Sequence, residues 1–519
     1  MLILVARCAG LSSRVNWVAL ALAAAGVLLA QAAQAQGITD ARVLAITPNA
    51  SATQTFTDNV DLNGATKTAD SITRLSAGIG LRGQSGQVRG FLDYTLSELL
   101  YARRSNLNTT QNNLSANLSA DLAEGRARVD SSANISQSAV SAFGAQPNNS
   151  GLPNANTTEL RSLQISPSFR GPIGTGLRYT AVLGYGLTDA KNTTAGDSST
   201  ASASLHVEPS AAARVSWAVD ASHLTSDYKA GRVTDDDRLF GTGKLRLDDY
   251  DLMLSAHGGT ESTNMASVDR QRYNNWGVGA QWTPSPRTHL VAETERRFYG
   301  ESHTLSLDYR TALTVWRLSN TRSLSTGSGA SNGGARSSAF DYFFSNAALA
   351  AKFPDSSDRT KFVNAYLGQL GINPLSSFDP SFLQSAATVQ DRKELSMVWR
   401  NARSSAMVTL TQTNTHRVDP VIRVADDLQN AGDIQLRGLS VDLSHSLTPV
   451  SSLGLVLSVQ QSSAALTSQE NRQKLISLQY NARLTAVSNL LLGGRRAVYE
   501  TGLVSYAESA LYATYGIRF

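Results

Sequence analysis

The chain has 519 residues, a formal net charge of +5, and a hydrophobic fraction of 41%. That fraction is too ordinary for a bundle of membrane-spanning helices, and the small charge, without a basic run, excludes nucleic acid as a partner. A β-barrel is compatible with this composition, because half of each strand faces water and hides the apolar half from a hydropathy scan.

The first 35 residues have the pattern of a signal peptide. Arg7 and Arg14 give a positive start, residues 18–29 are apolar, and residues 33–35 form a small-x-small cleavage site. The competing interpretation, a membrane anchor, is disfavoured because the apolar stretch is short. We expect cleavage near Ala35, which removes Cys8 and leaves a mature chain, residues 36–519, without disulfides.

Residues 42–324 and 393–519 show long runs in which apolar and polar side chains alternate. Leu75, Ala77, Ile79 and Leu81, for example, alternate with small and charged residues. A period of two places one row of a strand on an apolar wall and the other on a wet wall. A soluble β-sandwich could show some of this alternation, but its persistence, with arginines inside the strands, favours a water-filled lumen. The predicted lumen-lining residues are Arg74, Arg82, Asp93, Arg178, Arg214, Asp220 and Asp442.

The spacing of turns predicts the number of strands. Short connections follow even-numbered strands, and longer connections rich in Asn, Ser and Gly follow odd-numbered ones. This alternation of short and long connections continues along the whole chain only if residues 302–324 are split into two strands at residues 309–312. We therefore predict an antiparallel transmembrane β-barrel of about 22 strands, with 20 or 24 as alternatives.

Residues 325–392 break the alternation and form a predicted helical insertion. A Ser/Gly linker precedes a segment with Phe340, Phe343 and Phe344 at helical spacings, and a second helix carries Phe362 and Tyr366. Because a barrel of this width leaks unless it is filled, we expect these aromatic residues to form a plug or constriction. The alternative is an external loop or cap.

The last strand ends with an apolar row that includes Leu511, Tyr515, Ile517 and Phe519. This pattern is typical of outer-membrane barrels, whose final strand is read by the barrel assembly machinery. The expected partners are therefore this machinery and outer-membrane lipid. The alternative is an ordinary amphipathic strand.

The sequence contains no pattern that predicts catalysis, a metal or a cofactor. Its seven histidines lack metal-ligand spacing. Ser444 and His445 are adjacent, so on a strand they point to opposite faces and cannot act as nucleophile and base. Residues 235–237, three consecutive aspartates, fit either a calcium site or a solvated loop. We expect no enzyme activity.

Several short stretches resemble one known family. These are residues 45–48, 54–60 and 90–101, with further similarity at residues 309–316 and 353–359. They resemble the PEP-CTERM system-associated outer-membrane β-barrel proteins. The resemblance implies the outer membrane of a Gram-negative bacterium and association with exopolysaccharide and exosortase-type protein-sorting gene clusters. Phe56 stands where the family commonly has Tyr.

Two functional classes remain. The first is an outer-membrane channel or conduit for the export of polysaccharide or of sorted surface proteins. The second is a non-conducting barrel whose loops anchor a surface polymer or a partner protein. Both need the same wall, so the strand pattern alone does not decide between them.

Overall fold

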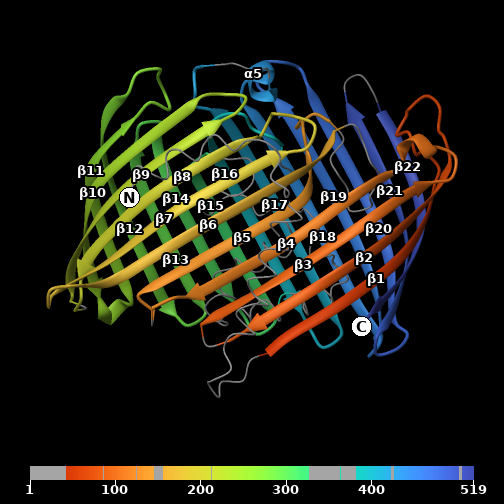
Figure 1. Cartoon of the computed structure of the whole chain (residues 1–519), viewed down its shortest axis with the longest axis horizontal. Coiled ribbons are helices and arrows are strands. Elements are labelled where there is room, and N and C mark those ends of the chain that lie inside the picture. The colour runs from red at the N-terminus through yellow and green to blue at the C-terminus, as the bar shows by residue number, and fades with distance from the viewer. Residues whose placement is uncertain are drawn as a thin grey trace.

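The chain folds into a closed β-barrel of 22 antiparallel strands (Figure 1). This computed structural model describes residues 43–519 except 86, 124, 145–155, 212, 327–362, 364–381, 422–425 and 502–504. The expected signal peptide lies outside these residues. The predicted fold and the predicted strand number are confirmed.

Each strand pairs with its two neighbours in chain order, and β22 returns to pair with β1. At this seam Thr53 lies opposite Thr514, and their hydroxyl oxygens are 2.9 Å apart. The ring therefore has no free strand edge, so each strand finds backbone hydrogen-bond partners on both sides.

The strands are 10 to 17 residues long. Three short helices are described over their full length in the connections: η2 (Ser105–Leu107), η3 (Asp248–Tyr250) and α5 (Asp427–Ala431). None of the helices in the described residues is long and apolar enough to cross a membrane.

The strands are β1 (Val43–Thr57), β2 (Asp70–Gln84), β3 (Val88–Tyr101), β4 (Thr109–Asp121), β5 (Ala127–Ala139), β6 (Thr157–Ile173), β7 (Leu177–Ala190), β8 (Ser198–Pro209), β9 (Val215–Tyr228), β10 (Val233–Leu247), β11 (Leu252–Thr263), β12 (Gln271–Ser285), β13 (Thr288–Arg297), β14 (Gly300–Arg310), β15 (Thr314–Ser325), β16 (Thr388–Arg400), β17 (Ser404–Arg417), β18 (Ile434–Thr448), β19 (Ser451–Ala464), β20 (Glu470–Arg483), β21 (Ser488–Thr501) and β22 (Ser505–Arg518).

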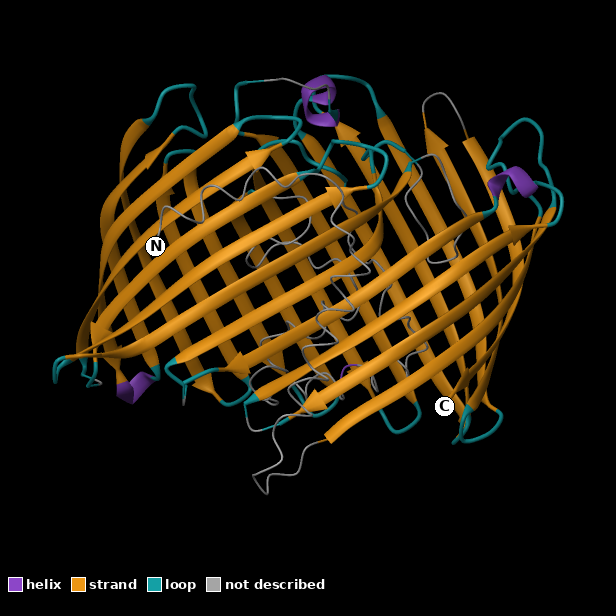
Figure 2. Ribbon diagram, viewed as in Figure 1, coloured by secondary structure: helices purple, strands orange, loops and turns teal. Residues whose placement is uncertain are grey.

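The two ends of the barrel differ. One end, the turn end, carries tight connections such as residues 286–287 and 449–450, and the C-terminus lies there (Figure 1). The other, the long-loop end, carries the longest connections, residues 140–156, 326–387 and 418–433. Figure 2 shows α5 and η2 at the long-loop end and η3 at the turn end.

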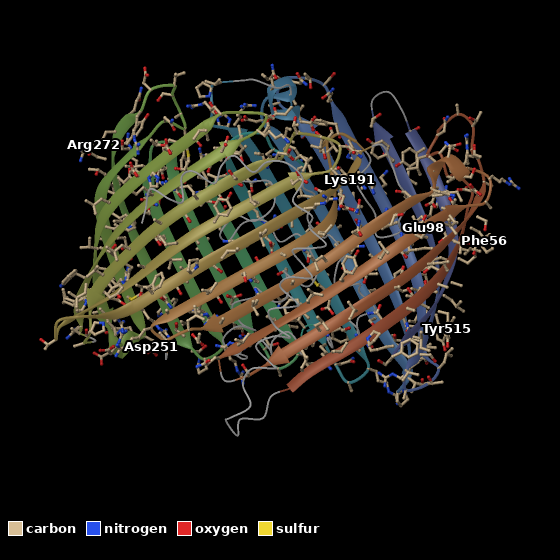
Figure 3. The ribbon with its side chains drawn as sticks, viewed as in Figure 1. Phe56, Glu98, Lys191, Asp251, Arg272 and Tyr515 are labelled. Carbon is tan, nitrogen blue, oxygen red and sulfur yellow. The ribbon has the colours of Figure 1, made fainter. Side chains whose placement is uncertain are left out.

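Alternate residues of each strand point outward and inward. On β22, Leu511 is 67% exposed and Tyr515 is 47% exposed, whereas the neighbouring inward residues Glu508 and Ala510 are buried. Figure 3 shows Tyr515 and Phe56 on the outer surface of the wall. The outward rows form an exposed apolar belt around the barrel, which includes Ile46, Leu75, Leu96, Leu183, Trp217, Leu254, Trp276, Leu318, Leu410, Leu457 and Leu492.

Two predicted boundaries meet different outcomes. The split near residues 309–312 is confirmed, because β14 ends at Arg310 and β15 begins at Thr314. The predicted end of the insertion at residue 392 is wrong, since residues 388–392 are the first residues of β16 and pair with residues 321–325 of β15. Only residues 326–387 connect these two strands.

Candidate functional site: the barrel lumen

The strand register places six of the seven predicted lumen residues on the inner face. Arg214 differs, because it is an exposed residue of the turn that precedes β9. Its turn places it at the turn end of the barrel, beside the lumen mouth rather than in the wall. The six inward residues are Arg74, Arg82, Asp93, Arg178, Asp220 and Asp442.

Two of these arginines form ion pairs with carboxylates of adjacent strands. Arg82 Nη2 lies 3.0 Å from Asp93 Oδ2, which joins β2 to β3. Arg178 Nη2 lies 2.8 Å from Glu208 Oε1, which joins β7 to β8. Each pair places opposite charges side by side, so it braces the wall and leaves little net field in the lumen.

Asp220 and Asp442 also have partners. Asp220 Oδ1 lies 2.6 Å from Nδ1 of His206 across β8 and β9. Asp442 is buried, and its Oδ2 accepts a 2.8 Å hydrogen bond from the hydroxyl of Ser440. These contacts fit a wall-bracing role for most of the predicted residues, which the sequence pattern could not distinguish from a role in selectivity.

A different feature of the lumen is a neutral polar wall on β4 to β8. In the middle of these strands the inward residues carry hydroxyl or amide groups, or are glycine or valine, and the charged residues lie near the turn end. The inward side chains of this wall are only partly buried, so the lumen face is accessible. The neutral wall comprises Ser115, Asn117, Ser132, Asn134, Ser162, Gln164, Ser166, Val182, Gly184, Gly186, Thr188, Thr200, Ser202 and Ser204.

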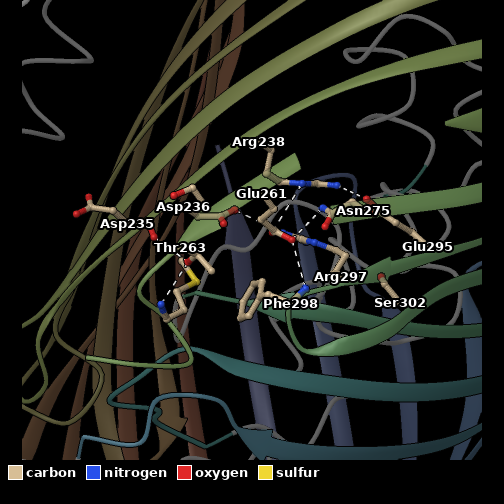
Figure 4. A network of polar contacts seen from close by, with 12 residues as sticks. Asp235, Asp236, Arg238, Glu261, Thr263, Asn275, Glu295, Arg297, Phe298 and Ser302 are labelled. Atoms are coloured by element: carbon tan, nitrogen blue, oxygen red, sulfur yellow. Dashed lines mark hydrogen bonds and ion pairs between the residues drawn. The ribbon is translucent and has the colours of Figure 1, made fainter. Parts of the chain in front are cut away.

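The inner face of β10 to β13 carries a charged cluster that the sequence did not predict (Figure 4). Glu261 has no exposed surface and contacts the guanidinium of Arg297, and its Oε2 accepts a 2.9 Å hydrogen bond from Asn275 Nδ2. Arg297 Nη2 also lies 3.4 Å from Asp236 Oδ2. Arg238 contacts Glu295 across two intervening strands. The only possible sequence signal is that these charges share inward parity on neighbouring strands.

This cluster changes the interpretation of the aspartate run at residues 235–237. The run lies within β10 and not in a loop, so its carboxylates alternate between faces. Asp236 points inward into the cluster, whereas Asp237 points outward and contacts Arg270. Both sequence-based alternatives, a calcium site and a solvated loop, are therefore wrong. In the described part of the chain, no group of three or more His, Cys, Asp or Glu could hold a metal ion.

The long-loop end of the lumen is crossed by residues 382–387, the described end of the insertion. These residues are buried, and Phe382 forms a parallel bridge with Ala139 at the end of β5. Leu383 packs against Leu160 and Ala190 of β6 and β7. Because β16 lies about half a ring away from these strands, the segment spans the barrel from one wall toward the other.

Loops from other parts of the ring meet this segment. A Cβ atom added to Gly231, between β9 and β10, would lie 2.7 Å from the carbonyl oxygen of Ser385, so only glycine allows this approach. The hydroxyl of Ser385 donates to Asp426, which also caps α5 by accepting a 2.9 Å bond from the amide of Gln429. Arg232 Nε lies 3.0 Å from Asp419 Oδ1, and this ion pair joins the β9–β10 loop to the β17–β18 loop.

The loop between β5 and β6 completes the crossing. Asp427 Oδ2 accepts hydrogen bonds of 2.8 Å from the hydroxyl of Ser141 and 2.6 Å from the amide of Ala142. Burial raises the pKa of Asp427, against the effect of these two bonds. Tyr499 of β21 donates a 2.6 Å bond to the carbonyl of Phe143 in this loop. We call residues 139–144, 229–232, 382–387 and 426–432 the loop closure.

The aromatic residues predicted to plug the lumen lie outside the described residues. They are Phe340, Phe343, Phe344, Phe362 and Tyr366. Within the same insertion Val363 is described, and it is helical and fully buried. The described residues Val363 and 382–387 of the insertion are buried, and the role of the five aromatic residues stays a prediction.

The comparisons with known proteins return structures but no family. No protein-family model matches the chain, and no curated protein matches it. Among solved structures, it is similar to the FrpB iron transporter from Neisseria meningitidis, F5-1 variant, with 10% identity, a TM-score of 0.47, and coverage of 91% of this chain and 82% of that chain. BauA, the ferric preacinetobactin receptor from Acinetobacter baumannii, has 11% identity, a TM-score of 0.44, and coverage of 91% and 80%. The anion-selective porin from Comamonas acidovorans has 10% identity, a TM-score of 0.33, and coverage of 92% and 100%.

Proposed function

We propose that the chain is an outer-membrane conduit for a weakly charged polymer, with exopolysaccharide as the preferred substrate class. The apolar belt supports the membrane location, because exposed leucines and tryptophans around a closed barrel would be costly in water. The resemblance to the PEP-CTERM system-associated barrels supports the same location and substrate. The long-loop end then faces outward and the turn end faces the periplasm.

The observation that carries the proposed substrate is the neutral wall on β4 to β8. Hydroxyl and amide groups both donate and accept hydrogen bonds, so they can exchange partners with the hydroxyls of a sugar chain. A polymer can slide through the lumen only if no single site binds it tightly, because conduction needs many weak binding sites rather than one of high affinity. Rows of Ser, Asn and Gln such as Asn134, Ser162 and Gln164 provide such weak sites. A row of arginines would bind an anionic chain too tightly.

A second candidate, the non-conducting anchoring barrel, is favoured by the loop closure. Buried contacts such as Arg232 with Asp419 and Ser141 with Asp427 join loops from distant parts of the ring. If these contacts never open, the barrel displays a fixed loop surface and passes nothing. The two candidates differ in whether a sugar chain enters the lumen.

Current recordings with added oligosaccharide test the proposed substrate. A neutral oligosaccharide added on the turn-end side should enter along the neutral wall and interrupt the ion current. Replacing Asn134 and Ser162 with Asp should shorten the interruptions caused by an anionic oligosaccharide of equal length and leave the neutral one nearly unaffected. The conduit is contradicted if no oligosaccharide interrupts the current at any concentration that the bilayer tolerates.

A further inference from the structure

The outer surface of β16 to β19 carries an unusual border between apolar and cationic rows. Leu395, Leu410 and Leu439 lie opposite one another across three strands and are 37%, 44% and 38% exposed. One outward position nearer the long-loop end, the next row reads Lys393, Gln412 and Arg437 in the same register. The two rows are about 7 Å apart along the strands.

Lys393 and Arg437 are the two cations of this outward row on β16 and β18. Both side chains are exposed, and neither forms an ion pair with any residue that the structure describes. On the wall near β10, by contrast, Arg270 contacts Asp237. Further along the same border, Lys474 lies 3.1 Å from Glu500. The cations on the two strands that flank Gln412 are therefore available to an anion from outside the chain.

The spacing of the two cations suits one anion. They are two strands apart, which corresponds to ~10 Å between their backbones, and long side chains can converge from that distance. Between them, the amide of Gln412 can donate a hydrogen bond. A groove of about 470 Å³ lies over this surface and is lined by both cations, by Gln412 and by the leucine row. It thus offers a cationic end and an apolar end in one continuous recess.

We propose that this groove binds a phosphorylated, acylated lipid of the outer leaflet, with phosphate between Lys393 and Arg437 and an acyl chain over Leu395, Leu410 and Leu439. Charge complementarity selects phosphate, because a guanidinium and an ammonium both form strong charge-assisted hydrogen bonds to its oxygens. The leucine row selects an acylated molecule over free phosphate, since only the former covers apolar surface. This inference rests on the proposed outer-membrane location, where the long-loop end faces the outer leaflet.

The test uses the full-length folded barrel in detergent, titrated with lipid A and followed by native mass spectrometry. Wild type should bind phosphorylated lipid A about tenfold more tightly than the same lipid after dephosphorylation. The double variant K393Q/R437Q should lose this preference. Q412E, which places a carboxylate between the cations, should lose it as well. R272Q, which removes an exposed outward cation five strands from the middle of the row, should retain it. Inorganic phosphate at millimolar concentration should not compete.

Each outcome is informative because folding and insertion are measured separately. Heat-modifiable electrophoretic mobility reports the folded barrel, and insertion into lipid bilayers reports the proposed membrane location. Variants that insert normally and still prefer phosphorylated lipid would overturn the lipid site and leave the membrane barrel intact. Competition by inorganic phosphate would assign the cations to a free anion instead. Failure of the wild type to insert would contradict the proposed function itself.

Discussion

Adjacent residues of one strand experience different solvents, and this determines what each position tolerates. Leu183 of β7 points outward and is 45% exposed, whereas Ser202 of β8 lies on the neutral inner wall opposite Gly184. The alternation of these rows was predictable from the sequence because a strand has a period of two. The ion pairs of the inner face were not, because strand pairing decides which charges meet.

Arginine substitutions at these two positions test the assignment of faces. Leu183→Arg should lower the free energy of unfolding from lipid by about 2–4 kcal/mol, because it places a charge in the apolar belt. Ser202→Arg should cost clearly less, since its guanidinium enters a wet lumen. Equal losses for both variants, measured by denaturant titration in lipid vesicles, would contradict the assigned faces.

A buried ion pair closes the ring on its inner side. Arg495 of β21 and Glu508 of β22 form two hydrogen bonds of 3.0 and 3.1 Å, and Thr57 of β1 donates a 2.8 Å bond to the same carboxylate. The three residues join the last two strands to the first. Their side chains are nearly inaccessible, so the pair depends on its geometry being complete.

Removing one partner of this pair should destabilise the seam. Glu508→Ala leaves Arg495 buried without its carboxylate and should cost about 3–5 kcal/mol of unfolding free energy. The matched control is Glu500→Ala, which breaks the exposed pair with Lys474 and should cost less than about 1 kcal/mol. Comparable costs for the two variants would mean that the seam does not depend on this pair.

At the scale of elements, the strands follow local sequence and the loop closure does not. The turn between β14 and β15 was predictable from strand parity, and the boundary before β16 was missed because residues 388–392 are mostly polar. Ser141 and Asp427, which meet in the loop closure, are 286 residues apart in the chain. Such contacts depend on the order of strands around a closed ring, which no periodicity encodes.

The loop closure should respond to pH through Asp427. Burial raises the pKa of its carboxyl above the ordinary value of 3.8, so the folded loops favour the protonated form. Stability from this group is therefore fully present below pH 3.8 and is lost as the pH rises through the raised pKa. Hydrogen exchange of the amides at residues 139–144, corrected for intrinsic rates, should show less protection above that pKa.

A neutral side chain separates this effect from general acid responses. Asp427→Asn keeps an oxygen that can accept from Ser141 and Ala142, and it cannot titrate. Its loops should show the same protection on both sides of the transition. If the wild type and this variant respond identically to pH, Asp427 does not control the loop closure.

In the whole molecule, loops from four connections around the ring meet at one end of the barrel. The sequence predicted the 22 strands and the presence of an insertion, because these follow from turn spacing and from a break in alternation. It could not predict the partners of that insertion, since residues 382–387 contact β5, β6 and β7 on the other side of the ring. The wall is independent of these contacts, because the β15–β16 ladder ends at the pair Ser325 and Thr388.

Whether the loop closure shuts the lumen can be tested by single-channel conductance. The wild type is compared with a variant that lacks residues 326–387. A short polar linker between Ser325 and Thr388 preserves every ladder bond of the wall, so the variant should show normal heat-modifiable mobility. We expect a low conductance for the wild type and a severalfold higher conductance for the variant, recorded in the same planar bilayers. A folded variant with unchanged conductance would contradict the claim that the loop closure shuts a conducting lumen.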